Sequence, residues 1–234
     1  MKYSVRKVQR RLRELGYYAG RIDGIQGPKT NTAIINFKKS KGLAARAYIG
    51  PLTLSALFDN ARPPKRSTGT LPWMRMALGY LGLREIRGSR HNPQILTWWQ
   101  LIRAPFTDDE TPWCAGFVGG IFEGLGIRST RSAGARSYEK WGVGLSGPAV
   151  GAVVTFWRGK PTGWSGHVGF VVGRDQSNNL MVLGGNQGNA VSIKPFARKR
   201  VTSYRWPDGA PSPATGMALL PVVKSDGRLS TNEA

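Results

Sequence analysis

The sequence predicts an α+β fold in two parts: a small three-helix module, then a larger domain with helices packed on an antiparallel sheet. Apolar residues recur at helical spacing over residues 1–58. The periodicity stops in a stretch rich in Pro, Gly and small polar residues, and beyond it helical segments precede strand-like runs. Helices ahead of strands are typical of α+β domains. We expect domains at 1–58 and 71–223, a linker at 59–70 and a polar tail at 224–234.

The N-terminal module contains a short internal repeat. Gly27–Ala33 resembles Gly50–Ala56, because each segment places Gly-Pro and a Thr just ahead of a helix with an inward Ala. Proline suits the first turn of a helix, and duplication within a small unit favours a compact module. The apolar faces of the expected helices are Val5, Val8, Leu12 and Leu15, then Ala33, Ile34 and Phe37, then Leu54, Leu57 and Phe58.

The larger domain is expected to begin with helices and to end with strands. The helical segments lie near 72–83, 93–102, 112–125 and 133–141. The strand-like runs are 152–157, 167–172, 180–183 and 190–193, with weaker candidates at 201–206 and 217–223. The last dozen residues are polar, and we expect them to be frayed.

Positive charge is the strongest feature of the composition, with 34 Lys and Arg, 13 Asp and Glu, and a net charge of +21. Residues 1–66 carry 15 of the basic and 3 of the acidic residues, so the N-terminal module is the stronger electrostatic anchor. Such a chain attracts nucleic acid, anionic lipid or anionic wall polymers, or keeps a basic surface for solubility. No nucleic-acid-binding signature accompanies the charge, so we expect no nucleic-acid partner.

Cysteine and apolar content exclude several classes. Cys114 is the single cysteine, so neither an intramolecular disulfide nor a Cys-rich zinc site can form. No apolar run follows the N-terminal charges, and no stretch of about 18 apolar residues occurs, so we expect neither a secretory signal nor stable membrane insertion. We expect no metal and no cofactor, and a monomer made in the cytoplasm.

Cys114 lies in the first turn of an expected, mostly apolar helix, with Thr111 as its cap and Pro112 in its first position. Unpaired N–H groups and the positive helix end favour a thiolate there and could hold an oxyanion. The alternative is a small buried core residue. The carboxylates of residues 108–110 oppose a thiolate if they lie close to the sulfur; otherwise they bind substrate cations or face solvent.

A thiol hydrolase needs a base, and the chain has two histidines. His91 lies in a polar stretch typical of a surface loop. His167 opens an expected strand, where a structural role is the alternative. With a helix-start cysteine in the same domain, a Cys114–His167 pair is the sharper hypothesis.

Hairpin geometry suggests a third catalytic residue beside Cys114 and His167. If the strand from His167 returns as 180–186, Gly173 lies opposite Leu180 and His167 opposite Asn186. Opposed side chains lie roughly 4.5–5.5 Å apart at Cβ, so Asn186 could orient the imidazole. The turn length is assumed in this pairing. A register slip of one or two residues would instead place another residue opposite His167: Gly184, Gly185, Gln187 or Gly188.

Residues 4–58 resemble the peptidoglycan-binding domain found on many wall hydrolases. Two departures are Lys38, where the family usually has Gln, and Ala47-Tyr48, which replace an Asp-Gly. The resemblance implies that Asp23 and Gly24 help to form a wall-binding groove; a tight turn is the alternative. The matching pieces are Val8-Gln9-x-x-Leu12, Gly16-Tyr17, Ile22–Ile25, Gly27-Pro28-x-Thr30, Ala33, Phe37, Gly42-Leu43 and Gly50-Pro51-x-Thr53.

Residues 71–207 resemble the CHAP group (cysteine, histidine-dependent amidohydrolase/peptidase) of the NlpC-like, papain-related superfamily. This implies a papain-like fold with Cys114 as nucleophile, His167 as base and Asn186 as the orienting residue. Glu110 and Gln187 flank these groups in sequence and are expected to shape the oxyanion site or the cleft. The matching pieces are Arg84–Ile86, Gly88, Asn92-Pro93, Ile95, Pro112–Ala115, Phe117-Val118, Ala135–Tyr138, Trp141-Gly142, Gly166–Gly169, Leu183–Gln187 and Arg205–Pro207.

Together the two resemblances imply a peptidoglycan hydrolase that cuts an amide of the stem peptide or its junction with muramic acid. The arrangement looks like a bacteriophage endolysin, which waits in the host cytoplasm until a holin lesion gives access to the wall. Peptidoglycan is the expected partner, with anionic envelope polymers beside it. Four tryptophans either line a sugar-binding cleft or pack in the core: Trp98, Trp99, Trp157 and Trp164.

Other functions remain open at this point. A lysozyme-type glycosidase needs paired carboxylates, and the sequence gives no pairing geometry for Glu85 and Glu110. In a non-catalytic wall adaptor, Cys114 would simply be packed. A bacterial autolysin or a secreted amidase effector would share the predicted chemistry. The scarcity of His and Cys disfavours a zinc peptidase.

Overall fold

The computed structural model describes residues 4–41, 43, 45–58, 71–88, 90–225 and 228–230. The chain divides into two compact units: Met1–Pro72 with Gly124–Gly126, and Trp73–Glu123 with Ile127–Ala234. The predicted linker at 59–70 lies outside the described residues, so the predicted domain boundaries stay predictions. Within the described ranges, no helix combines the length and apolar character that a membrane crossing requires.

The first unit contains α1 (Val5–Glu14), α2 (Pro28–Ser40) and α3 (Pro51–Phe58), as predicted. The Ser4 side chain caps α1 by accepting from the Lys7 N–H, and Pro28 occupies the first turn of α2. Leu15 and Phe58 were expected inside, but their side chains are 36% and 41% exposed because both lie at helix ends. The buried core consists of Val8, Leu12, Tyr18, Ala33, Ile34, Phe37, Ile49 and Leu57.

The sequence repeat is also a structural repeat. Thr30 Oγ1 donates to the carbonyl of Ile25 (3.2 Å), and Thr53 Oγ1 donates to the carbonyl of Tyr48 (3.5 Å). A buried polar side chain of the preceding helix meets the same carbonyl in each copy. Gln9 Nε2 donates to the Ile25 carbonyl (3.0 Å) in the first, and Lys38 Nζ donates to the Tyr48 carbonyl (3.1 Å) in the second.

Lys38 makes the stability of this unit depend on pH. Its side chain is 3% exposed, and burial, reinforced by the charge of Arg46, lowers its pKa from 10.5 to about 8. Between pH 8 and 10.5 the unfolded chain therefore binds more protons, so stability rises with pH in that interval. At about 1.36 kcal/mol per pKa unit, the whole rise is roughly 3 kcal/mol.

We expect Lys38→Met to abolish this rise and to raise the melting temperature of the first unit at pH 7. Every tryptophan lies at or beyond residue 73, so tryptophan fluorescence follows the second unit while circular dichroism follows the helices of both. Loss of helix without a fluorescence change isolates the first unit. A wild-type first unit with the same stability at pH 7 and pH 10 would contradict the prediction.

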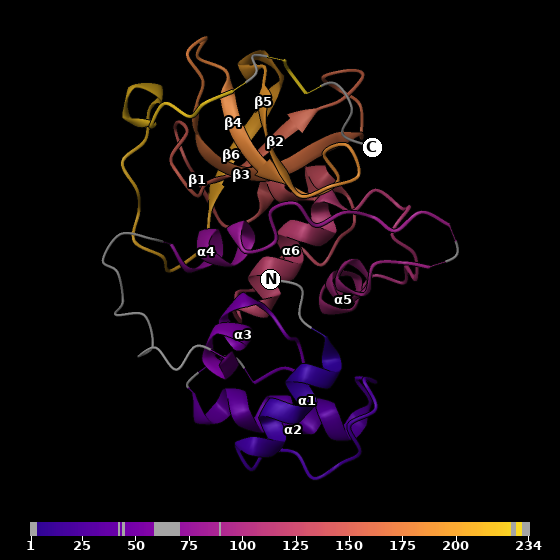
Figure 1. Cartoon of the computed structure of the whole chain (residues 1–234). Helices are drawn as coiled ribbons and strands as arrows, with labels where there is room; N and C mark the ends of the chain where they lie inside the picture. The colour runs from indigo at the N-terminus through magenta and orange to yellow at the C-terminus, as the bar shows by residue number, and fades with distance from the viewer. Residues whose placement is uncertain are drawn as a thin grey trace. The chain divides into compact units, whose positions relative to one another are not determined.

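The second unit packs helices on an antiparallel sheet, which is the predicted α+β class. Its described helices are α4 (Pro72–Leu78), α5 (Pro93–Leu101) and α6 (Cys114–Gly124). Phe117 and Phe122 of α6 place their rings against Phe170 of the sheet, with centroids 6.1 and 5.5 Å apart. Figure 1 shows α6 running along one face of the sheet, with α4 and α5 on the same side.

The described strands form one six-stranded sheet in the order β1-β6-β2-β3-β4-β5. Each strand pairs antiparallel with its neighbours. The central pair is β2 with β3, and the expected hairpin is β3 with β4. The strands are β1 (Val143–Gly144), β2 (Val153–Trp157), β3 (Gly166–Arg174), β4 (Leu180–Gly184), β5 (Ser192–Phe196) and β6 (Val201–Trp206).

Several predicted elements differ from the structure. The segment 133–141 forms the 3₁₀ helix η1 (Ala135–Lys140), and the predicted strand 217–223 is a 3₁₀ turn with a single bridge between Arg174 and Val222. The strand predicted at 190–193 begins two residues later. The tail is tied down where it is described, because the Ser230 N–H donates to the carbonyl of Pro195 (2.8 Å).

Candidate active site

Cys114 is the first residue of α6, so it lies in the first turn as predicted. The predicted cap is wrong, because the helix begins two residues later than expected and its first bond runs from the Phe117 N–H to the Trp113 carbonyl (2.8 Å). Thr111 instead donates its N–H to the carboxylate of Asp108 (2.6 Å), which fixes the loop ahead of the helix.

Burial has the largest effect on the pKa of the Cys114 thiol. The side chain is 4% exposed, and burial raises the pKa of the thiol to about 11. Backbone N–H groups, that of Val168 first, and the charge of Arg158 lower this pKa only in part. The expected thiolate is therefore not the resting form. A helix start supplies favourable dipoles, but desolvation of the charged sulfur outweighs them.

His167 lies on β3, one residue before the Val168 whose N–H acts on the Cys114 sulfur. The fold therefore brings α6 to the strand that carries the histidine. The His167 ring is fully buried and stacks on Phe196, with centroids 5.1 Å apart and ring planes 5° apart. Burial and stacking on Phe196 restrict the rotation of the imidazole.

Gln187 holds the imidazole of His167. Gln187 Oε1 lies 3.1 Å from His167 Nε2. The Gln187 amide nitrogen donates to the Ser192 carbonyl (2.7 Å), the Ser192 hydroxyl (3.1 Å) and the Val182 carbonyl (3.3 Å). Three acceptors around that nitrogen fix the amide orientation, so its oxygen faces the ring. His167 Nε2 must then carry a proton, and in the neutral ring Nδ1 carries the lone pair.

Gln187, and not Asn186, makes the hydrogen bond to the His167 imidazole, so the orienting role predicted for Asn186 stays a prediction. The assumed pairing is present at Phe170–Leu183 and Val171–Val182, but an irregularity follows, and Gly173 pairs with Met181 instead of Leu180. Strand β4 ends at Gly184, and Asn186 adopts a left-handed conformation with φ 55°. No hydrogen bond between Asn186 and His167 occurs among the described residues. The Asn186 side chain is 1% exposed, and its Oδ1 has no hydrogen-bond partner within the described chain.

Two glycines let the end of β4 and the residue after it approach His167 and the start of α6. A Cβ at Gly184 would lie 2.9 Å from His167 Nε2. A Cβ at Gly185 would lie 2.6 Å from Phe117 Cβ and from the Trp113 ring. The segment 184–187 therefore lies against Trp113 and Phe117 of the α6 region on one side and against His167 on the other. This Gly-Gly pair is the sequence signal that the strand ends before Asn186.

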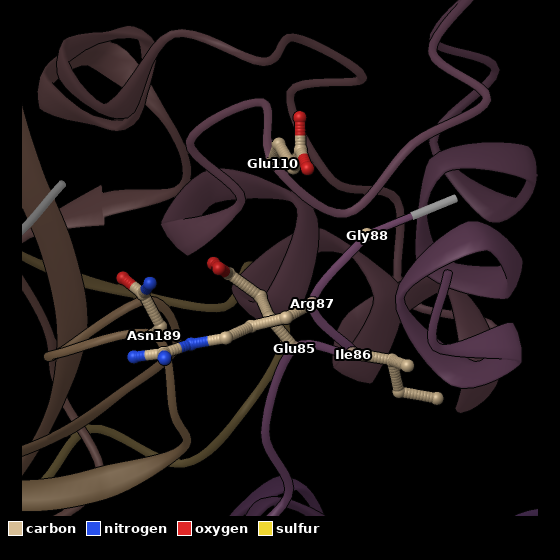
Figure 2. Close-up of a pocket in the computed structure, with 6 residues that line it drawn as sticks. All are labelled: Glu85, Ile86, Arg87, Gly88, Glu110 and Asn189. Carbon is tan, nitrogen blue, oxygen red and sulfur yellow. The ribbon is translucent and has the colours of Figure 1, made fainter. Parts of the chain in front are cut away.

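A pocket of about 350 Å³ lies beside Trp113, the residue before Cys114; its lining residues are Glu85, Ile86, Arg87, Gly88, Glu110 and Asn189. The Trp113 indole N–H donates to Glu85 Oε1 (2.7 Å). Burial raises the pKa of Glu85, although the Trp113 bond partly offsets this effect. Figure 2 shows Arg87 extending toward Asn189, with Glu110 on a separate loop. Glu110 is exposed and contributes to the lining of this pocket.

The remaining predicted residues have structural contacts. Asp109 is buried and accepts from the N–H groups of Ile86 (2.9 Å) and Asn92 (2.8 Å) and faces His91 Nδ1 (3.1 Å). These bonds order a loop that includes His91, as predicted for that residue. No group of His, Cys, Asp and Glu able to hold a metal occurs within the described ranges.

Asp23 and Gly24 form a turn in the first unit that is built around Gln9. Gln9 Nε2 donates to Asp23 Oδ1 (2.8 Å), and Gln9 Oε1 accepts from the Gly24 N–H (2.9 Å). The Gln9 bond lowers the pKa of Asp23. The Gly24 φ of 82° explains the glycine. The tight-turn alternative thus has direct structural support, whereas a wall-binding role of these two residues stays a prediction.

The raised pKa of Cys114 predicts slow alkylation by iodoacetamide in the free protein. Below a pKa of about 11 the thiolate fraction grows about tenfold per pH unit, so the rate constant should still rise between pH 8 and 10. Urea-unfolded protein is the control and should level off near its ordinary pKa of 9.0. A rate constant that is already level below pH 7 would indicate a preformed thiolate and contradict the prediction.

In a comparison with known protein families, each unit contains a match to one family. Residues 2–57 match the family described as "Putative peptidoglycan binding domain", and residues 106–186 match the CHAP domain. The CHAP match contains Cys114 and His167 and stops one residue before Gln187.

Individual relatives are more distant or shorter. The chain is 41% identical over 54 residues to N-acetylmuramoyl-L-alanine amidase CwlM of Mycobacterium tuberculosis, which covers 23% of this chain and 13% of that relative. A solved NlpC/P60 family protein from Bacillus cereus has a TM-score of 0.38 at 18% identity, over 58% of this chain and 39% of that one. Two family models thus match separate parts of the chain, the peptidoglycan-binding domain in its first unit and the CHAP domain in its second.

Proposed function

We propose that the chain is a cysteine peptidoglycan hydrolase that cleaves an amide of the stem peptide or its junction with muramic acid. The observation that carries the proposal is the buried arrangement of Cys114, His167 and Gln187 within a CHAP domain. The peptidoglycan-binding family match of the first unit supports the wall as the substrate.

In the proposed reaction the first step couples proton transfer to attack. His167 Nδ1 takes the proton of the Cys114 thiol as the sulfur bonds to the amide carbon, which becomes a tetrahedral oxyanion. A neutral resting thiol suits this route, because no isolated thiolate has to exist in the buried site. Backbone N–H groups at the start of α6 are the proposed oxyanion donors.

The second half releases the products. When the C–N bond breaks, protonated His167 gives its proton to the leaving amine, and a thioester to Cys114 remains. A water molecule then attacks the thioester while His167 takes its proton. Collapse of that intermediate returns the proton to the sulfur and releases the carboxylic acid. Gln187 accepts the Nε2 hydrogen throughout and so stabilises the imidazolium in each half.

The proposal is tested by the products formed from purified peptidoglycan. We expect new free amino groups and no new reducing sugar ends, with fragment masses that name the cleaved amide. New reducing ends would indicate a glycosidase and overturn the proposal. If the wall binds the protein but no bond breaks, a non-catalytic wall adaptor becomes the better description.

We further propose the endolysin role for this hydrolase. The supporting feature is the pairing of a wall-binding family with a CHAP domain in one basic chain. Expression in a susceptible bacterium, with and without a holin, tests it. We expect lysis only when both proteins are present; lysis by the hydrolase alone would favour a self-exporting autolysin or effector.

A further inference from the structure

Trp164 differs from the other tryptophans proposed above for a sugar cleft. Its side chain is 91% exposed, whereas Trp98 and Trp99 are fully buried and therefore belong to the core. The ring of a tryptophan is large and mostly apolar, so leaving it in water forgoes a considerable burial free energy. An isolated, almost fully exposed ring of this size is suited to contact a ligand.

The loop that carries Trp164 is ordered by hydrogen bonds. The Arg158 N–H donates to the Ser165 carbonyl (3.1 Å), which closes the loop at its base. Arg136 donates to the carbonyls of Pro161 (2.8 Å) and Gly163 on the far side. Arg136 is itself held by Glu139, 2.7 Å away. The aromatic ring is thus presented on a preorganised turn, which reduces the entropy lost on binding.

This loop stands next to the candidate active site. It connects β2 to β3 directly after the Trp157–Gly166 pair, so Trp164 precedes His167 by three residues. Arg158 at the base of the loop also acts electrostatically on Cys114, because its charge contributes to lowering the pKa of the thiol. A polymer whose scissile amide reaches Cys114 would therefore extend past this turn.

We propose that Trp164 binds the C–H face of an N-acetylated pyranose of the glycan strand, next to the amide that is cut. A pyranose ring offers a flat apolar face, which packs on an indole ring, while its hydroxyls stay in water. Arg158 and Lys160 on the same loop supply cations for carboxylates of the attached stem peptide. The inference rests on the proposed function and assigns it a sugar subsite.

The binding test uses peptide-free glycan chains and tryptophan emission. In a Cys114→Ala background, we expect the glycan to cause a saturable blue shift and intensity change, and we expect Cys114→Ala/Trp164→Phe to lack that change. The first unit has no tryptophan, so glycan bound there does not mimic the signal. An identical response of the two variants, or no saturable response, would overturn the inference.

The kinetic test compares Trp164→Ala, Trp164→Phe and the wild type on intact peptidoglycan. We expect Trp164→Ala to raise KM about 3- to 10-fold with little change in kcat, and Trp164→Phe to retain most of the affinity. Leu219→Ala is the matched control, because Leu219 is 62% exposed in the same unit, and it should behave as the wild type. Wild-type KM in Trp164→Ala would count against the subsite.

The two proposals fail differently. A wild-type protein that cleaves no amide but shows the Trp164-dependent glycan signal would refute the hydrolase and keep the sugar subsite. Amide cleavage with neither a glycan signal nor a change of KM in Trp164→Ala would keep the hydrolase and refute the subsite.

Discussion

Replacing Cys114 by alanine is expected to abolish amide cleavage, with a loss of turnover on the order of 10⁴-fold or more. The sulfur forms and breaks the covalent bond in the proposed reaction, and no other thiol exists in the chain to replace it. The readout is the release of free amino groups from purified peptidoglycan, which detects slow residual cleavage better than turbidity.

The same variant should still bind the wall. The family match for wall binding covers residues 2–57 and does not include Cys114. Removal of one buried sulfur leaves a small cavity, so the near-UV circular dichroism spectrum should be unchanged and the stability loss modest. Co-sedimentation with peptidoglycan gives the binding control. A Cys114→Ala protein that cleaves as fast as the wild type would remove the thiol mechanism and restore the glycosidase as the leading alternative.

Local patterns in the sequence were sufficient to place Cys114 and His167 in the fold, although their catalytic roles stay predictions. A helix-start cysteine and a strand-start histidine are recognisable from their immediate neighbours, and the structure brings their elements together. The same holds for the helix of residues 93–102 and for the strands from 152 to 183, whose apolar runs are long and bounded by turns.

Properties that depend on tertiary packing could not be predicted in this way. The pKa of Cys114 is raised by burial, and no local pattern states how deeply the first turn of α6 is covered. The irregularity between Val171 and Gly173 also has no clear sequence signature, and it shifts part of the β3–β4 register by one residue. Lys38 is a further case, because a lysine buried against a carbonyl contradicts the usual preference of its side chain.

The second large effect that we expect is a fall in turnover when Gln187, and not Asn186, is replaced. Gln187→Ala removes the acceptor of the buried His167 Nε2 hydrogen. The imidazole then loses the bond that fixes its tautomer and stabilises its charged form. Turnover should fall on the order of 10²-fold while KM changes little, because the loss concerns the proton transfers and not substrate contacts. Gln187→Glu keeps an acceptor oxygen but loses the donors to Ser192, so we expect an intermediate rate.

Asn186→Ala is the matched control, one residue away in the same segment. It leaves the His167–Gln187 bond and the bonds of Gln187 to Ser192 in place, so we expect less than about a tenfold fall in turnover. Circular dichroism of both variants checks that the segment after β4 remains folded. A larger loss in Asn186→Ala than in Gln187→Ala would reverse the assignment and favour Asn186 as the residue that orients the imidazole. The opposite order would establish a Cys-His-Gln arrangement, in which the glutamine reaches the ring because the strand ends at two glycines.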